Sequence, residues 1–262
     1  MEFIQSIQNS KVKQWAKLIS KKGREQEHAF LVEGEHLVEE AMKAEELIQC
    51  LIIQETMQEK YQGWIDECRA PSYLVSEQVM NKLSETQTPQ GICAVVQINK
   101  HSLSELTEGR PILLALDGLQ DPGNLGTIIR TADAAGIDGV ILGKGTVDLY
   151  NGKVIRSTMG SIFHLPIFQL DLTVEIPRLK EKGFRIVSTS LEGAVAYDEP
   201  QYADAVVIVI GNEANGVSQE ILQCSTTKVK IPLYGQAESL NAAVAAGIIL
   251  YEAARQRRKL QG

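Results

Sequence analysis

Polar residues gather in three short stretches, each of which directly follows a predicted strand. The stretch DGLQDPGNLG follows Ile112 to Leu116, GNEANG follows Val206 to Ile210, and PLYGQAESLN follows Lys228 to Ile231. Their carboxylates, amides and hydroxyls could bind a ligand or move a proton, and their glycines let a ligand approach the backbone closely. In open α/β sheets, ligands bind beyond the carboxyl ends of the strands. We therefore expect the three stretches to form one functional site.

The elements that carry these stretches alternate between strands and helices over residues 111–262. The run at 206–210 consists of β-branched residues and shows no polar alternation, which is typical of a strand buried on both faces of a parallel sheet. Strands are predicted at Ile112 to Leu116, Gly139 to Leu142, His164 to Phe168, Arg185 to Ser188 and Val206 to Ile210. Helices are predicted at Leu125 to Ala135, Asn151 to Thr158 and Thr173 to Lys182, and a long one from Ser239. This alternation predicts an α/β domain with right-handed crossovers.

A smaller α/β unit precedes that domain. Residues 1–98 again alternate between predicted strands, such as Cys50 to Ile53, and predicted helices, such as Glu35 to Ala44. The polar stretch NKHSLSELTEGR then ends at Pro111, which makes it the candidate linker. The predicted organisation is an N-terminal domain at 1–98, a linker at 99–110 and a second domain at 111–262.

Basic residues are concentrated in two segments of the chain. The formal net charge is −7, which by itself disfavours a nucleic-acid partner. However, no acidic residue lies between Ser10 and Arg24, and Val12, Trp15 and Ile19 recur there at helical spacing, which leaves the lysines on the opposite face. This face is either an RNA-binding surface or a solvated helix face, and the same alternatives hold for the basic C-terminus. The cations are Lys11, Lys13, Lys17, Lys21, Lys22 and Arg24, and Arg255, Arg257, Arg258 and Lys259.

Several classes of protein are disfavoured. No window approaches the 18 apolar residues of a membrane span, and the N-terminus lacks the apolar core of a signal peptide, so a cytoplasmic location and no membrane partner are expected. The four cysteines and four histidines are scattered, which disfavours a metal site or a disulfide framework. Complete P-loop and dinucleotide-binding fingerprints are missing, and no Ser, His and Asp set has supporting local context.

The polar stretches carry a family resemblance. DPGNLGTIIRTADAAG, VIVIGNEANGVS and KIPLYGQAESLNAAVAAGI resemble, in order and separation, the three motifs of the SpoU (TrmH-like) RNA 2′-O-ribose methyltransferases. The resemblance covers residues 111 to about 252. The segment REQEHAFLVEGEHLVEEAMKA resembles the L30e-like substrate-binding domain that precedes the catalytic domain in many members that act on ribosomal RNA.

This resemblance implies a fold, a cofactor and a site. The implied C-terminal domain is an α/β trefoil-knot (SPOUT-type) methyltransferase domain that binds S-adenosylmethionine, acts on RNA, most readily ribosomal RNA, and forms a homodimer without a metal. A transfer-RNA substrate and a non-catalytic RNA-binding protein on the same scaffold are the alternatives. The implied cofactor residues are Thr189, Ser190, Gly211, Asn212, Gly216, Ile231, Leu233 and Leu240. The implied catalytic residues are Asn124, Arg130, Glu213, Ser239 and Asn241.

Methyl transfer from a sulfonium needs little covalent help from these catalytic side chains. The ribose hydroxyl must lie in line with the methyl group and lose its proton as it attacks. Arg130 either holds the phosphate beside the target nucleotide or accepts that proton, and the phosphate role is favoured because a guanidinium is a poor base. Three of the others have a structural alternative: Ser239 and Asn124 could cap helices, and Glu213 could satisfy backbone donors in its loop.

Overall fold

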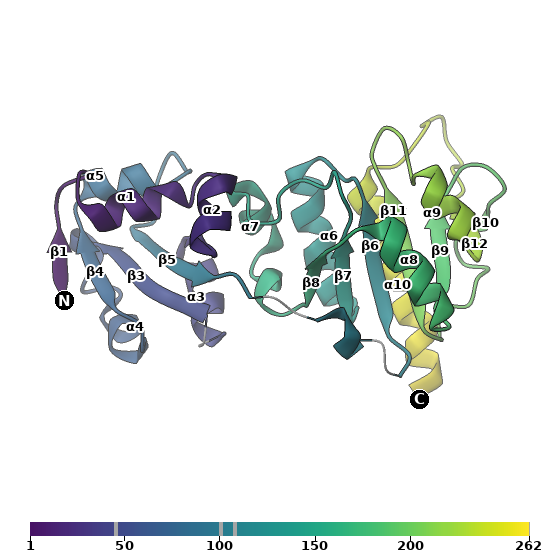
Figure 1. Cartoon of the computed structure of the whole chain (residues 1–262), viewed down its shortest axis with the longest axis horizontal. Helices are drawn as coiled ribbons and strands as arrows, with labels where there is room; N and C mark the ends of the chain where they lie inside the picture. Colours follow the sequence, from purple (N-terminus) through teal and green to yellow (C-terminus); the bar gives the residue numbers. More distant parts are fainter. Residues whose placement is uncertain (45–46, 100–101, 107–108, 262) are drawn as a thin grey trace. The chain divides into compact units, whose positions relative to one another are not determined.

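The computed structural model describes residues 1–44, 47–99, 102–106 and 109–261, and it divides into two compact units (Figure 1). The first comprises Met1–Asn99 and Asp148–Phe163, and the second comprises Lys100–Val147 and His164–Gly262. The predicted linker at 99–110 includes residues 100, 101, 107 and 108, which lie outside the described residues. Within the described part of the chain, no helix is long and apolar enough to cross a membrane.

The first unit contains a mixed five-stranded sheet in the order β1-β4-β3-β5-β2. β4 pairs in parallel with β1 and β3, whereas β5 is antiparallel to β3 and β2. Its edge strand β1 was not predicted, since only three residues at the extreme N-terminus form it. The strands are β1 Glu2–Ile4, β2 Ala29–Glu33, β3 Ile48–Gln54, β4 Ser72–Val75 and β5 Ile92–Gln97.

Helices cover both faces of this sheet because successive residues of each strand point to opposite sides. On one face, Ile52 packs with Trp15 and Met80, which lie on α1 and α5. On the other face, Ile53 packs with Val38 of α3 and with Ile155. The helices are α1 Ser10–Lys17, α2 Lys21–Glu27, α3 Glu35–Lys43, α4 Gln62–Glu67 and α5 Glu77–Leu83, with a 3-10 turn, η2, at Glu55–Met57.

Gly23 lies in a helix, although glycine disfavours helix interiors. It lies inside α2, where a Cβ would be 2.0 Å from the carbonyl oxygen of Lys17. Ser20 caps this helix by accepting a hydrogen bond from the backbone N–H of Gly23 at 3.1 Å. Glycine is therefore needed for the close approach of α2 to the end of α1, and not for an unusual backbone angle.

The second unit contains a seven-stranded sheet in the order β10-β12-β9-β11-β6-β7-β8, and all its pairs are parallel. The central strand β11 is buried along its whole length, as its apolar run predicted. The two-residue edge strand β10 was not predicted. The strands are β6 Ile112–Asp117, β7 Gly139–Leu142, β8 Ile167–Gln169, β9 Arg185–Thr189, β10 Val195–Ala196, β11 Val206–Gly211 and β12 Thr227–Lys230.

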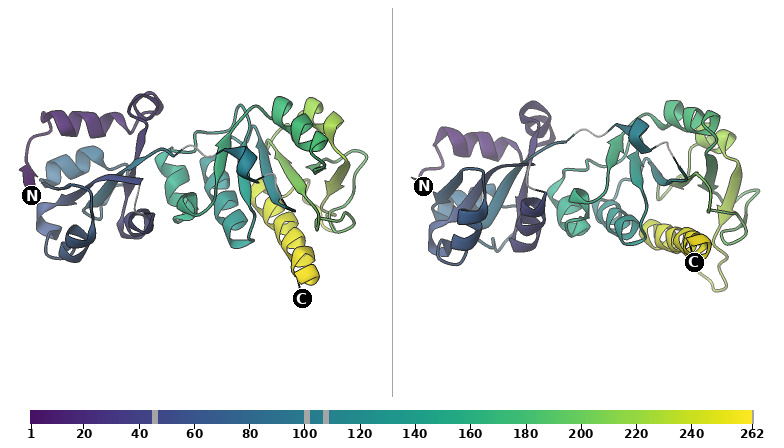
Figure 2. Two further views of the ribbon diagram at one scale, coloured as in Figure 1. Left: turned by 60° about the horizontal axis from the view of Figure 1, so that its bottom comes forward. Right: turned by 90° about the horizontal axis from the view of Figure 1, so that it is seen from below.

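Helices cover both faces of the second sheet as well (Figure 2). Ile176 of α8 and Ile221 of α9 pack with Val207 and Val209 of β11 on one face. α6 and α10 contact each other, and a Cβ on Gly247 would lie 3.6 Å from the methyl group of Thr131. These helices are α6 Pro122–Ala134, α8 Leu172–Glu181, α9 Gln219–Cys224 and α10 Ala242–Gln261, with a 3-10 turn, η3, at Leu103–Leu106.

The residues between β7 and β8 form α7 Gly152–Thr158 and the 3-10 turn η4 Ser161–Phe163. They pack with the first unit, although their neighbours in sequence belong to the second. The predicted helix at 151–158 is therefore present, but no sequence pattern indicated where it packs. The predicted domain boundaries and the trefoil knot stay predictions.

Candidate active site

Two of the polar stretches leave the second sheet side by side. β6 and β11 are paired neighbours, and their last residues, Asp117 and Gly211, lie opposite each other. Asn212 holds the two loops together, since its Nδ2 donates to the carbonyl of Gly118 at 2.8 Å. Asp117 accepts a hydrogen bond from the backbone N–H of Ser218 at 2.8 Å. The strand register thus places both loops at one edge of the sheet, as expected of a parallel sheet.

Glu213 binds the loop that follows β6. Its carboxylate accepts hydrogen bonds from the backbone N–H groups of Gln120 and Asp121 and from Nδ2 of Asn124, each at 3.1 Å. Partial burial would by itself raise the pKa of Glu213, but the hydrogen bonds from Asn124, Gln120 and Asp121 outweigh it and lower the pKa below its ordinary value. At neutral pH the side chain is an ionised acceptor with three donors, which makes it a fixed part of the site and a poor proton acceptor.

Asn124 connects Glu213 to the third polar stretch. Its Oδ1 accepts a hydrogen bond from Nδ2 of Asn241 at 2.9 Å. The donor contact with Glu213 fixes the amide orientation of Asn124, because a carboxylate can only accept. Residues from three separate segments, at positions 124, 213 and 241, therefore form one hydrogen-bonded chain.

Asn241 also begins α10. Its Oδ1 accepts hydrogen bonds from the N–H groups of Ala243 at 2.9 Å and Val244 at 3.3 Å. The expectation that the helix opens at Ser239 was wrong, because α10 starts at Ala242 and the capping oxygen belongs to Asn241. The cap of α6 likewise comes from Asp121, which accepts from Asn124 N at 2.7 Å, and not from the Asn124 side chain. Aspartate before Pro122 is a helix-start signal that could have identified this cap.

The glycines predicted at the cofactor site shape the loop after β11. A Cβ on Gly211 would lie 2.0 Å from the carbonyl carbon of Gly216, so only glycine allows this approach. Gly216 has φ 68°, in the left-handed region that favours glycine. Asn212 closes the loop by accepting hydrogen bonds from Ala214 N at 2.9 Å and Asn215 N at 3.1 Å.

The other predicted cofactor residues follow neighbouring strands. β9 lies between β11 and β12, so Thr189 and Ser190 emerge next to the loop of Gly211. The hydroxyl of Thr189 donates to the carbonyl of Val209 at 3.3 Å, and Ser190 N donates to the carbonyl of Val229 at 3.0 Å. Ile231 and Leu233 follow β12, and Leu233 and Leu240 are exposed. The strand order therefore brings these segments to the same edge of the sheet.

Arg130 and Ser239 do not join the hydrogen-bonded chain. Both are exposed, and neither side chain has a hydrogen bond to another described residue. Arg130 lies on α6 six residues beyond Asn124, a rise of about 9 Å along the helix. Among the described residues, no group of three or more His, Cys, Asp or Glu side chains could hold a metal ion.

Comparison with known families bears directly on these residues. Residues 111–251 match the SpoU rRNA Methylase family, and residues 9–94 match an MRM3-like substrate binding domain. This chain belongs to the SpoU rRNA methylase family. It is an S-adenosylmethionine-dependent RNA methyltransferase of mixed α/β fold with an N-terminal substrate-binding domain, as the motif resemblance indicated.

Relatives cover almost the whole length of this SpoU methylase. It is 42% identical to the 23S rRNA (guanosine(2553)-2′-O)-methyltransferase RlmP of Bacillus subtilis, over 96% of this chain and 98% of that protein. The AdoMet-bound rRNA methyltransferase from Sinorhizobium meliloti superposes with a TM-score of 0.87 at 33% identity, covering 97% of each chain. The AdoMet complex of the SpoU methyltransferase AviRb from Streptomyces viridochromogenes gives 0.87 at 28% identity, covering 96% of this chain and 99% of that one.

Proposed function

We propose that this methylase transfers a methyl group from S-adenosylmethionine to the 2′-hydroxyl of a guanosine in 23S-type ribosomal RNA in the cytoplasm. The observation that carries this proposal is the hydrogen-bonded chain of Glu213, Asn124 and Asn241, which joins all three family motifs at the edge of the second sheet. The near full-length similarity to a 23S rRNA 2′-O-methyltransferase supports the substrate. Cofactor binding is assigned to Thr189, Ser190, Gly211, Asn212, Gly216, Ile231, Leu233 and Leu240.

Ribosomal RNA is favoured over transfer RNA because of the N-terminal unit. The solved Aquifex aeolicus tRNA modifying enzyme covers only 61% of this chain, with a TM-score of 0.52. The Bacillus subtilis relative, which is named for 23S rRNA, instead aligns with 96% of this chain and therefore with both units. A non-catalytic RNA-binding role is disfavoured because the motif side chains at 124, 213 and 241 are present and bonded to one another.

The proposed roles follow from charge and position. Glu213 is held by three donors and holds the loop at 120–124, while Asn241 places Asn124. Arg130 is the exposed cation of the helix that carries Asn124, and we assign it the phosphate next to the target ribose. A guanidinium is a strong donor set for phosphate and a poor base. Ser239 is assigned to the ribose hydroxyl, since its own hydroxyl is exposed in the loop before the Asn241 cap.

A homodimer is part of the proposal. α10 exposes Val244 and Tyr251, which are 52% and 54% accessible and seven residues apart. Seven residues are close to two helical turns, so both side chains lie on one face. Such a face fits a second copy of this chain.

The substrate is tested with purified full-length protein and labelled S-adenosylmethionine. We expect methylation of 23S ribosomal RNA or of a large-subunit assembly intermediate, and none of transfer RNA. The label should map to a guanosine. Methylation of transfer RNA alone would refute the proposed substrate and leave the reaction class intact.

A further inference from the structure

The segment 148–163 completes the core of the first unit. Its Ile155 is buried in the same apolar cluster as Phe30 and Val38. The ring of Tyr150 lies 4.7 Å from that of Phe30, at an interplanar angle of 36°. The chain region that matches the methylase family therefore supplies part of the core of the substrate-binding unit.

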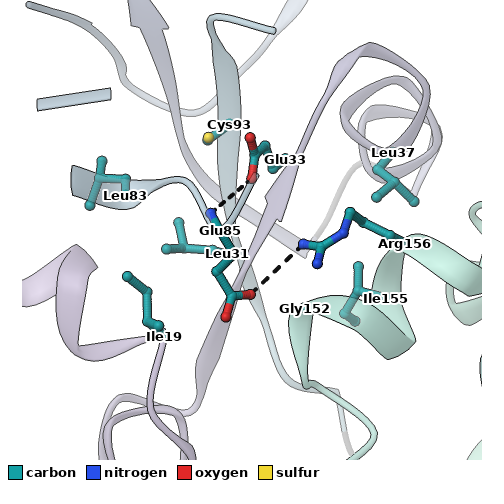
Figure 3. Close-up of a pocket in the computed structure, with 10 residues that line it drawn as sticks. All are labelled: Ile19, Leu31, Glu33, Leu37, Leu83, Glu85, Cys93, Gly152, Ile155 and Arg156. Atoms are coloured by element: carbon teal, nitrogen blue, oxygen red, sulfur yellow. Dashed lines mark hydrogen bonds and ion pairs between the residues drawn. The ribbon is translucent and has the colours of Figure 1, made fainter. Parts of the chain in front are cut away.

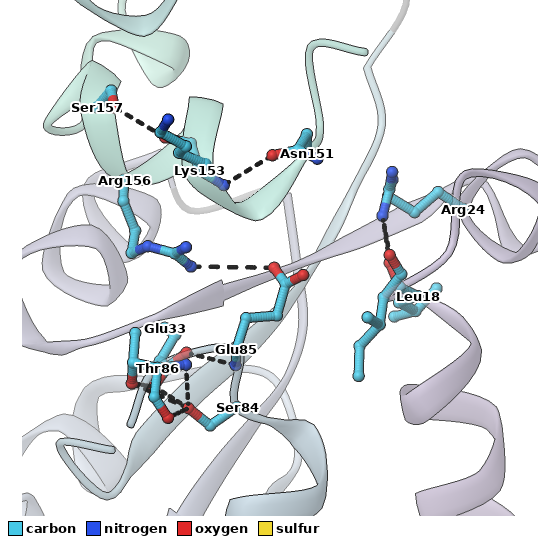
Figure 4. Close-up of polar contacts among 11 residues, drawn as sticks. Leu18, Arg24, Glu33, Ser84, Glu85, Thr86, Asn151, Lys153, Arg156 and Ser157 are labelled. Carbon is cyan, nitrogen blue, oxygen red and sulfur yellow. Dashed lines mark hydrogen bonds and ion pairs between the residues drawn. The ribbon is translucent and has the colours of Figure 1, made fainter. Parts of the chain in front are cut away.

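Polar contacts inside the first unit fix α7 as well (Figures 3 and 4). Arg156 lies 3.9 Å from the carboxylate of Glu85, and Glu85 N donates to the carboxylate of Glu33 at 3.3 Å. The side chains of Glu85, Ile155 and Arg156 line a small pocket with Leu31 and Leu37. A Cβ on Gly152 would lie 1.7 Å from Oε2 of Glu85, so a larger residue there would displace this carboxylate.

Asp148, the first residue of the segment, is bound by a buried arginine. Arg24 is only 6% exposed, and its guanidinium donates to the Asp148 carboxylate. The same guanidinium donates to the carbonyl of Leu18 at 2.8 Å (Figure 4) and to that of Ile19 at 2.7 Å. Arg24 thus belongs to no RNA-facing surface, although the basic run at 10–24 includes it. Removing one partner of such a buried pair leaves the other charge uncompensated.

The residue before Asp148 is bound to the catalytic loop. Val147 N donates to the carbonyl of Leu119 at 2.8 Å, and the hydroxyl of Thr146 donates to the carbonyl of Leu116 at 3.2 Å. The next two residues after Leu119 donate the N–H groups that hold Glu213. One peptide bond therefore separates a residue bonded to the Glu213 loop from a residue bonded to Arg24.

We propose that Arg24 is a positioning residue for methyl transfer. By fixing Asp148, it restrains Val147, and through the Val147–Leu119 hydrogen bond it restrains the loop at 117–121 that holds Glu213. The inference rests on the proposed role of Glu213 in the reaction. It assigns the pair a task beyond stabilising the first unit, because the residue that Arg24 fixes is joined by one peptide bond to Val147, which is hydrogen-bonded to the catalytic loop.

Inserting two glycines between Val147 and Asp148 in the full-length protein tests this link. The insertion adds slack but leaves the Arg24–Asp148 pair and the contacts within each unit in place. The matched control inserts two glycines after Gly183, in an open turn where a Cβ on the glycine would have no neighbour within 4 Å. We measure kcat, KM for the RNA, S-adenosylmethionine affinity and amide exchange at Gln120 and Asp121.

The proposal predicts that the insertion at 147 lowers kcat roughly ten- to a hundredfold, because small displacements of catalytic groups are costly. KM and cofactor affinity should stay within about twofold, and exchange at Gln120 and Asp121 should accelerate. Arg24→Met combined with Asp148→Leu removes the pair without leaving a lone buried charge and should give the same signature. Arg156→Met, which changes a side chain of α7 itself, should leave kcat and the exchange rates unchanged.

Unchanged exchange at Gln120 and Asp121 in the insertion variant would overturn the inference, as would faster exchange with unchanged kcat. If exchange accelerates in the insertion variant as predicted but the wild-type protein methylates no RNA, the proposed function is refuted instead. The exchange measurement needs no activity, so the two failures are distinguishable.

Discussion

At the scale of single residues, the site depends on one carboxylate with three donors. Glu213 accepts from Gln120, Asp121 and Asn124, and its lowered pKa keeps it ionised at neutral pH. Because the folded-state pKa of Glu213 lies below its unfolded value, ionised Glu213 contributes to stability, and this contribution is fully present above the ordinary carboxyl pKa. It is lost as the pH falls through the folded-state pKa. Acid should therefore loosen this loop, whereas alkali should not.

Glu213→Gln should lower kcat about ten- to a hundredfold. The Gln side chain would place an NH2 group against the donors that bind the Glu213 carboxylate. It would also lose the charge-assisted hydrogen bonds, each worth about 1.5–3 kcal/mol. Single-turnover methyl transfer measures the effect. Glu192→Gln, in the exposed loop after β9, is the control and should retain full activity. Wild-type rates in Glu213→Gln would contradict the role assigned to this carboxylate.

Arg130→Ala should reduce methylation by at least about a hundredfold and leave S-adenosylmethionine affinity nearly intact, because the proposed partner of Arg130 is an RNA phosphate. Calorimetry with the cofactor and kinetics with RNA separate the two effects. Arg178→Ala, an exposed arginine on α8, serves as the matched variant. An equal loss of cofactor affinity and rate would refute the phosphate assignment.

At the scale of elements, α1 and α2 carry fewer free cations than the sequence suggested. Lys11 pairs with Glu2, Lys17 with Glu27 and Lys21 with Glu25. Val12 and Trp15 are buried, as their spacing predicted, but Ile19 lies beyond the end of α1 and is exposed. The partners of the lysines come from β1 and α2, elements that the sequence did not reveal. Lys13 and Lys22 are exposed and form no ion pair with another described residue.

We infer that Lys13 and Lys22 are the cations of this face that meet RNA. Lys13→Gln combined with Lys22→Gln should weaken RNA binding and reduce the slope of log K against log salt by about 1.4–1.8, since each lost phosphate contact contributes about 0.7–0.9. Binding titrations at several salt concentrations measure it. Lys43→Gln with Lys60→Gln removes two lysines that are paired with carboxylates and should leave the slope unchanged. An unchanged slope in the first variant would make α1 an ordinary solvated helix.

Sequence patterns identified the elements whose signals are local. The buried run at 206–210 predicted β11, and the three motifs predicted side chains that do meet, at positions 124, 213 and 241. Long-range packing left no such signal. The contact of Gly23 with Lys17 depends on how two helices meet, which no local pattern shows, and α7 gave no sign that it packs with the first unit. Short edge strands such as β1 were not predicted from the sequence, because pairing with a neighbouring strand, and not composition, defines them.

At the scale of the whole molecule, the proposal requires two copies of the chain. Val244→Asp places a charge on the exposed apolar face of α10 and should convert a dimer to a monomer, as light scattering after gel filtration would show. Val174→Asp changes a 41% exposed valine on α8 and should leave the mass unchanged. A monomeric wild-type protein would refute the dimer.

The most direct test of the central claim is nucleoside analysis of ribosomal RNA from a strain that lacks this protein, before and after treatment with the purified enzyme and S-adenosylmethionine. We expect one added 2′-O-methylguanosine in the 23S-type RNA, and none with the Arg130→Ala variant. A methyl group on a base, or no new methylated nucleoside in naked or ribosome-assembled RNA, would contradict this expectation.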